Sequence, residues 1–207
     1  MLGRPFGVPN DAAFQRKVLL AALRLLEQDS GPVLEDFPED APAGKLTPPP
    51  ESLVCPVSFP KMKTEGTLAE RLLDEVAQLQ AWHAVAARHR SRTTLGVTGL
   101  QLADVANYLS AWLGANPPPP YRSDLSPGEA LKHACDELKA FYYEAKSVQP
   151  GTHSSESLQN WFWSETAGGV ALREIRSAAA KSAEPSIKAV AMQSLIPRAV
   201  EGLVLQR

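Results

Sequence analysis

Several features that mark particular classes of protein are scarce or missing in this 207-residue chain. It has two cysteines, Cys55 and Cys135, which lie far apart. That number excludes a disulfide framework and a paired-cysteine metal knuckle, and it favours a reducing cytoplasm. Lys and Arg number 21 and Asp and Glu 23, a balance that argues against general binding to nucleic acid or anionic membranes. No apolar run approaches the ~18 residues of a membrane span. We therefore expect a cytoplasmic protein without nucleic-acid or membrane partners.

The sequence also lacks the common signatures of catalysis. It contains no glycine-rich phosphate loop, no His-Glu-x-x-His, no Cys-x-x-Cys and no Gly-x-Ser-x-Gly. Its four histidines form no Glu-x-x-His pair of the kind that carboxylate-bridged metal sites use. We therefore expect neither a metal nor a cofactor.

Proline, in contrast, is abundant, and its distribution divides the chain. The 18 prolines cluster mainly between Pro32 and Pro60 and in the run 117–120. Proline restricts the backbone and removes a hydrogen-bond donor, so these clusters predict extended segments. The sequence predicts an N-terminal loop and helix over residues 1–28, a proline-rich linker or arm over 29–65, and a helical bundle domain over 66–207.

Apolar residues recur at three- and four-residue steps in six segments, which predicts helices. The segments are 10–28, 67–89, 100–113, 126–146, 154–181 and a last one from 185. Residues 53–57 and 93–97 are candidate short strands. The predicted fold is mainly α, an orthogonal bundle of six to seven helices with a long proline-rich extended segment and at most a short two-stranded element.

Residues 154–181 are predicted to form one continuous helix at the centre of the bundle. Trp161 and Trp163 leave such a helix on opposite sides, which is typical of a helix with neighbours on both faces. Glu165 then falls on the apolar face, where a carboxylate must be paired or protonated. A structural ion pair with Arg173, Arg176 or a neighbouring helix explains it, and a functional acid in a pocket is the alternative.

Three further groups have two interpretations each. Cys135 lies on the apolar face of its helix and is predicted to be a small core residue rather than a reactive thiol. The cations at 88–92 complement a helix dipole, or they form a site for an anion or a partner. The side chains of His133 and Tyr142, together with Glu165 and Arg173, are the candidate catalytic or ligand-binding groups if the chain has a site of its own.

Short motifs along the whole chain resemble one known family. They are Leu2-Gly3-Arg4-Pro5-Phe6-Gly7-Val8-Pro9-Asn10, Phe14-Gln15-Arg16, Gly31-Pro32-Val33-Leu34-Glu35-Asp36-Phe37-Pro38, Cys55-Pro56-Val57, Leu138-Lys139-Ala140-Phe141-Tyr142, Gln149-Pro150-Gly151, Trp161-Phe162-Trp163-Ser164-Glu165-Thr166-Ala167 and Pro197-Arg198. Together they resemble the C-terminal part of the glycine/sarcosine/betaine/D-proline reductase selenoprotein B family, and most closely its selenium-free proteobacterial relatives.

The resemblance implies reductive thiol or selenol chemistry on small amino-acid-like substrates. In that family the reactive selenocysteine or cysteine lies in an α/β portion upstream of the Gly-Arg-Pro stretch, and this chain begins at that stretch. Cys55, between Val54 and Pro56, has the wrong context to replace it. We therefore assign the family's activity to no residue of this chain.

Two function classes follow as expectations. The first is a non-catalytic helical accessory or interaction module, because the apolar stripe of residues 14–26 and the proline-rich arm need something to bind. Its partner would be a second copy, giving a homo-oligomer, or a reductase-like α/β protein. The second is a small enzyme or ligand-binding protein that uses the four residues named above. A truncated reading frame that keeps a fold without a function is the remaining alternative.

Overall fold

The computed structural model describes residues 6–7, 11–40, 65–114, 116–151 and 154–197. The chain forms two compact units, Met1–Pro48 and Pro49–Arg207. Each unit has its own architecture. The candidate strand at 53–57 and the last predicted apolar turn at 200–204 lie outside the described residues.

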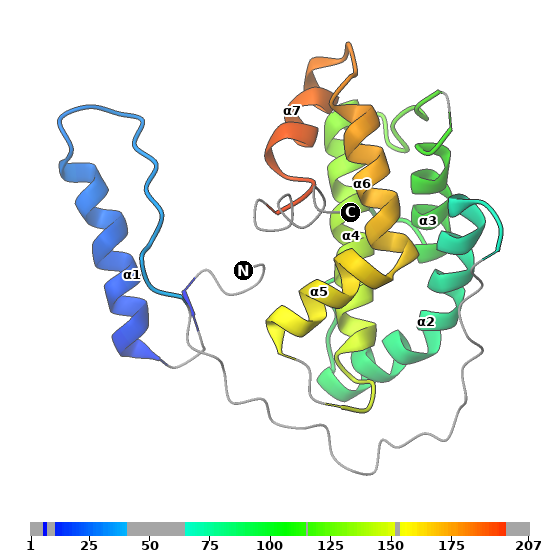
Figure 1. Cartoon of the computed structure of the whole chain (residues 1–207), viewed down its shortest axis with the longest axis horizontal. Helices are drawn as coiled ribbons and strands as arrows, with labels where there is room; N and C mark the ends of the chain where they lie inside the picture. The colour runs from blue at the N-terminus through cyan, green and yellow to red at the C-terminus, as the bar shows by residue number, and fades with distance from the viewer. Residues whose placement is uncertain (1–5, 8–10, 41–64, 115, 152–153, 198–207) are drawn as a thin grey trace. The chain divides into compact units, whose positions relative to one another are not determined.

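The first unit is a helix with a returning segment beside it (Figure 1). Helix α1 spans Ala12–Arg24 and continues into the short 3-10 helix η1, Leu25–Glu27. Residues 28–40, which we call the strap, then run back along α1. The Phe14 ring meets the Phe37 ring edge-on at 5.9 Å, and Lys17 pairs with Glu39 at 2.9 Å. The predicted N-terminal helix is confirmed, with Asp11 capping it.

The second unit is a bundle of six α-helices within the described residues. They are α2 Leu68–Arg90, α3 Leu102–Ala111, α4 Pro127–Lys146, α5 Ser155–Glu165, α6 Ala167–Ala179 and α7 Pro185–Gln193. With α1, this confirms the predicted mainly helical fold of six to seven helices, and the described part of the chain contains no strand. Residues 93–97, predicted as a candidate strand, form a loop instead.

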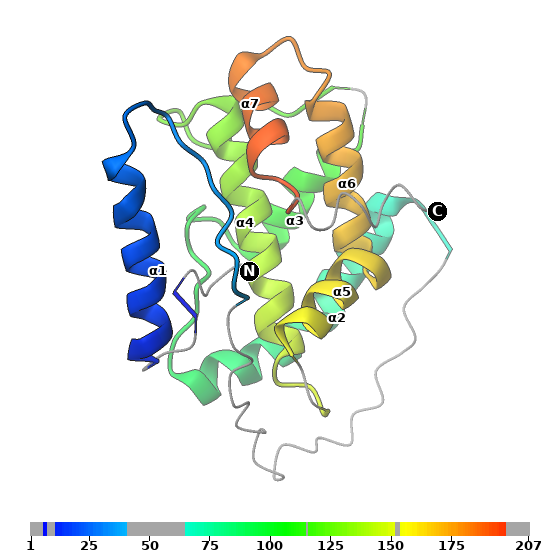
Figure 2. The same ribbon diagram turned by 60° about the vertical axis from the view of Figure 1, so that its left-hand side comes forward.

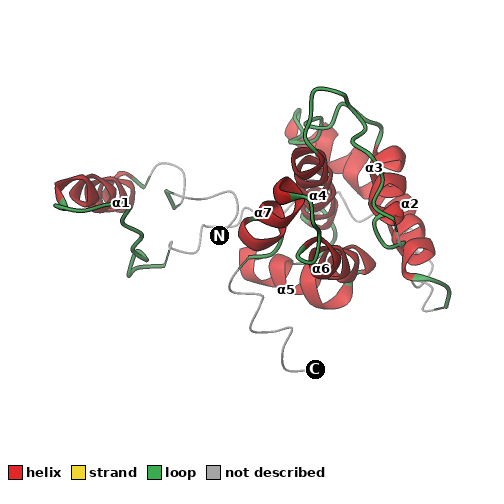
Figure 3. Ribbon diagram, turned by 90° about the horizontal axis from the view of Figure 1, so that it is seen from above, coloured by secondary structure: helices red, strands yellow, loops and turns green. Residues whose placement is uncertain are grey.

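Helix α4 is the central element of the bundle. It contacts α2, α3, α5, α6 and α7, and it lies between the pair α2 and α3 and the group α5, α6 and α7 (Figure 3). Its start lies at the predicted position, residue 126: Ser126 and Glu129 form a capping box, with Pro127 in the first turn. The prediction that residues 154–181 would be central is confirmed for α6, which also contacts every other helix of the bundle, but not for α5, whose contacts are mainly with α4 and α6.

The predicted continuous helix over 154–181 is wrong, because the chain breaks at Thr166. Helices α5 and α6 meet at an angle there (Figures 1 and 2). Thr166 has an extended backbone, with φ −107° and ψ 148°. Its hydroxyl donates to the Phe162 carbonyl at 2.6 Å and accepts from the Gly169 N–H at 2.9 Å. One threonine side chain thus ends α5 and caps α6.

Glycine at 169 is required by this break. A Cβ at that position would overlap the Phe162 carbonyl oxygen at the end of α5. The glycine therefore allows close approach of another backbone, that of the preceding helix α5. Among the described residues, no helix combines the length and apolar character that crossing a membrane requires.

Candidate functional site

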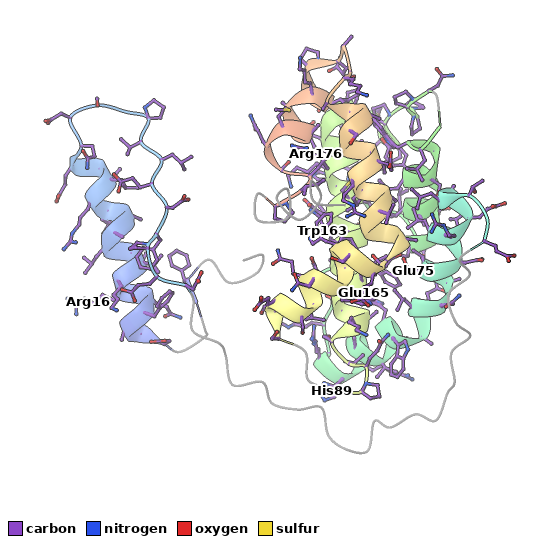
Figure 4. The ribbon with its side chains drawn as sticks, viewed as in Figure 1. Arg16, Glu75, His89, Trp163, Glu165 and Arg176 are labelled. Atoms are coloured by element: carbon purple, nitrogen blue, oxygen red, sulfur yellow. The ribbon has the colours of Figure 1, made fainter. Side chains whose placement is uncertain are left out.

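The most unusual buried polar group is the Glu75 side chain on α2. It lies on the inner face between Leu72 and Leu79 and is 2% exposed. Its Oε2 accepts hydrogen bonds from the Tyr142 hydroxyl at 2.7 Å and from the Gly168 N–H at 3.0 Å. Glu75 therefore joins α2, α4 and the first turn of α6. Figure 4 labels it beside the junction of α5 and α6.

Burial raises the pKa values of both Glu75 and Tyr142. Desolvation raises the pKa of Glu75, and the hydrogen bonds from Tyr142 and Gly168 offset part of that rise. Desolvation and the adjacent Glu75 raise the pKa of Tyr142 well above its ordinary value. A Cβ at Gly168 would lie 2.7 Å from the Tyr142 ring. The groups are packed against one another, so the arrangement acts as a buried cap for α6.

Two glutamates on α4 hold the loop between α2 and α3. Glu137 accepts from the N–H groups of Gly96 and Thr98, each at 2.8 Å. Glu144 accepts from the Thr94 N–H at 2.7 Å and from His83 Nε2 at 2.9 Å. The hydroxyls of Thr93 and Thr94 also donate to Glu144. These carboxylates supply the acceptors that the loop backbone lacks.

The donors around Glu144 also determine its charge state. Burial alone would raise the pKa of Glu144, but the hydrogen bonds from Thr94, Thr93 and His83 together lower it below its ordinary value. Glu144 is therefore held as a carboxylate, and the bond from His83 becomes an ion pair when the imidazole is protonated. This arrangement anchors a loop rather than positioning a reactive group.

The four candidate site residues from the sequence do not meet. Tyr142 is fully buried on α4, and His133, half-buried, lies roughly 13 Å away along the same helix at ~1.5 Å per residue. Arg173 is half-buried on α6, and Glu165 is exposed at the end of α5. The prediction that Glu165 lies on the apolar face is wrong, because the break at Thr166 changes the helical phase. Its charge acts on Lys146 instead, where burial lowers the pKa of the amine and Glu165 raises it.

Glu75, Glu137 and Glu144 were not among the candidates from the sequence, although a signal for one of them exists. Glu75 interrupts an apolar stripe, with Leu72 three residues before it and Leu79 four residues after it. A glutamate inside such a stripe predicts a buried carboxylate with donors around it. The same inference from an apolar stripe is wrong for Glu165, because that stripe was followed across the boundary between two helices.

The Cys135 thiol is a core group. Its side chain is completely buried, and burial raises its pKa to about 12. A thiol must lose its proton to act as a nucleophile or metal ligand, so Cys135 is inert at neutral pH. The prediction of a small core residue is confirmed. No group of three or more His, Cys, Asp or Glu side chains among the described residues is arranged to hold a metal ion.

Basic side chains gather at the C-terminal end of α2. Arg88, His89 and Arg90 occupy its last turn and are exposed, and Arg92 follows in the loop. Arg90 donates to the Ser147 hydroxyl at 2.7 Å. The position at a helix C-terminus accounts for the cations through the helix dipole.

Most of the large apolar side chains that are exposed among the described residues belong to the first unit. Leu19, Leu20, Leu23 and Leu26 are 49%, 44%, 57% and 80% exposed. We call these four side chains the outward face of α1, although the last of them, Leu26, lies in η1 directly after α1. The opposite side of the helix, which carries Phe14, is covered by the strap. Contiguous exposed leucines of this kind mark interaction surfaces.

Comparison of the chain with protein-family models, with curated proteins and with solved structures finds no match.

Proposed function

We propose that the chain is a non-catalytic helical interaction module related to the C-terminal part of the reductase family that its motifs resemble. The observation that carries the proposal is the outward face of α1. Four large leucines lie exposed on α1 and the η1 turn that continues it, and the other side of α1 is already covered. Exposed leucine surface costs free energy in water, roughly 25 cal/mol per Å², and a partner that covers it recovers that amount.

The buried polar groups support a module without its own reaction. Glu137 and Glu144 direct their carboxylate oxygens at loop donors, and Glu75 caps a helix. An active site needs acid, base or nucleophile groups that face a substrate. Within the described residues, both oxygens of Glu137 and Glu144 and the Oε2 of Glu75 bond to the protein's own backbone, hydroxyls and one imidazole, and the Oε1 of Glu75 is buried without a hydrogen-bond partner.

Two observations, the family resemblance and the exposed leucines, suggest what the partner is. The resemblance points to a reductase-like α/β protein in the cytoplasm, and the exposed leucines fit any apolar surface, including that of a second copy. In either case the outward face of α1 is the contact.

The test measures the mass of the chain's complexes by light scattering after size exclusion. Wild type, the variant L19D/L23D and the control M192D are tagged and compared, both pure and in extract of the producing organism. Met192 is a matched control because it is 63% exposed on α7 of the bundle. We expect wild type and M192D to elute above the 22.4 kDa of one chain and L19D/L23D to elute as a single chain. If all three elute as single chains in both settings, the proposal fails.

A further inference from the structure

We propose that the outward face of α1 pairs antiparallel with the same face of a second copy of this chain. This inference rests on the proposed function and names its partner. It depends on the order of leucines and charges along one helix.

Apolar and charged side chains share one side of α1. At ~100° per residue, Arg16, Leu20 and Leu23 project within about 60° of one another. Glu27 follows one turn after Leu23. Arg16 and Glu27 are both exposed. The leucines are thus framed by a cation toward the N-terminal end and an anion just beyond the C-terminal end.

This order is self-complementary under a two-fold axis. An axis placed midway between Leu20 and Leu23 is also midway between Arg16 and Glu27. Antiparallel pairing about it sets Leu20 of one copy opposite Leu23 of the other, and Arg16 opposite Glu27, twice in each pair. A parallel pair would instead set Arg16 against Arg16 and Glu27 against Glu27. The charges therefore select the antiparallel arrangement, and the same surface serves both copies, as in an isologous dimer.

The strap explains why this face is available. It covers the other side of α1 through the ring contact of Phe14 with Phe37 and the ion pair of Lys17 with Glu39. The contact is short, because α1 has 13 residues and is roughly 20 Å long at ~1.5 Å per residue. A standard stable interface covers about 800 Å² per partner, so we expect a dimer that dissociates on dilution.

The test is sedimentation velocity of the full chain over a concentration series at low salt. The variants are R16E, E27R, the double R16E/E27R, L23D, and M192D as the control. R16E sets two pairs of glutamates face to face and E27R two pairs of arginines, so we expect each alone to weaken the dimer at least tenfold. The double variant and an equimolar mixture of the two single variants restore opposite charges and should return to wild-type association. L23D should be a monomer and M192D a dimer.

The charge variants are not expected to unfold the helix. Both new residues are good helix formers, and Glu near the start of α1 and Arg near its end favour the helix dipole. Circular dichroism should therefore match wild type. If the mixture associates no better than either single variant, or if wild type stays a monomer at every concentration, antiparallel self-pairing is wrong.

The experiments can refute self-pairing and the interaction module independently of each other. A pure chain that is monomeric, but that forms a complex in extract which L19D/L23D abolishes, overturns self-pairing and leaves the interaction module standing. A dimer that L23D does not change overturns the outward face as the contact. A chain that is monomeric both pure and in extract overturns both proposals.

Discussion

The Tyr142 hydroxyl on α4 donates a 2.7 Å hydrogen bond to Glu75 on α2 in the closed interior of the bundle. The same carboxylate oxygen accepts the Gly168 N–H at the start of α6. Three helices that are distant in the sequence are therefore joined at one atom. This contact makes the break between α5 and α6 possible, because a helix that begins in the core needs an acceptor for its first N–H groups.

Replacing Tyr142 by phenylalanine should destabilise the bundle by about 1–3 kcal/mol, the usual cost of depriving a buried polar group of its partner. Urea unfolding of the full chain measures this cost. Tyr121→Phe is the control, because the Tyr121 hydroxyl is buried without a hydrogen-bond partner among the described residues. Equal losses in the two variants would show that the bond to Glu75 contributes nothing.

The raised pKa of Glu75 predicts a pH dependence. For a carboxyl whose pKa rises on folding, the stabilising contribution is complete below the ordinary value of 4.5 and is lost as pH rises through the folded-state pKa. The difference in unfolding free energy between wild type and Glu75→Gln should therefore be most favourable to wild type at acid pH and should decline toward neutral pH. Chemical unfolding of both proteins from pH 4 to 8 checks this. A constant difference would contradict it.

Glu144 should show the opposite trend, since its pKa is lowered on folding. Its contribution is complete above 4.5 and is lost as pH falls through the folded-state pKa. The amount by which the unfolding free energy of Glu144→Gln lies below that of wild type should thus be greatest at neutral pH and should decrease on acidification. The same unfolding series measures it. Hydrogen exchange at Thr94 gives a local readout, because that amide donates to Glu144 at 2.7 Å and should lose protection in the variant.

How far the sequence predicts this structure depends on the range of the interaction. Capping at Ser126 and Glu129 is a contact between near neighbours, so its residues alone were sufficient to place the start of α4. The break at Thr166 was missed because the sequence does not distinguish a threonine that bonds to both adjoining helices from an ordinary threonine inside one helix. The contact between Glu75 and Tyr142 depends on the packing of α2 against α4, which no local pattern encodes.

The candidate site failed for a related reason. Placing Glu165 on the apolar face required a constant helical phase from Leu158 to Leu172, and the extended backbone at Thr166 interrupts that phase. The carboxylates that are buried, Glu75, Glu137 and Glu144, lie in uninterrupted helices, where periodicity does give the correct face.

Replacing Gly169 by alanine should be strongly destabilising. The added Cβ would overlap the Phe162 carbonyl oxygen, which is backbone and cannot rotate away, so α5 and α6 must separate. We expect a loss of about 1–3 kcal/mol or more, as for overpacked cores, measured as a lower urea midpoint. Gly31→Ala is the control because nothing lies within 4 Å of its Cβ position. A Gly169 variant as stable as that control would mean that the junction is loosely packed.

Cys135 gives a chemical test of the closed core, which becomes specific once the only other cysteine, Cys55, is replaced by serine. In the Cys55→Ser chain, the remaining thiol has a pKa of about 12 and is fully buried. An aromatic disulfide reagent at pH 8 should therefore react with it only as fast as the bundle opens, and at once in urea. The rate should rise in Tyr142→Phe by about tenfold for each 1.4 kcal/mol of unfolding free energy that this variant loses, because the open population depends exponentially on that free energy. Rapid labelling of the native chain would show that the thiol is accessible and would reopen the possibility of thiol chemistry at this position.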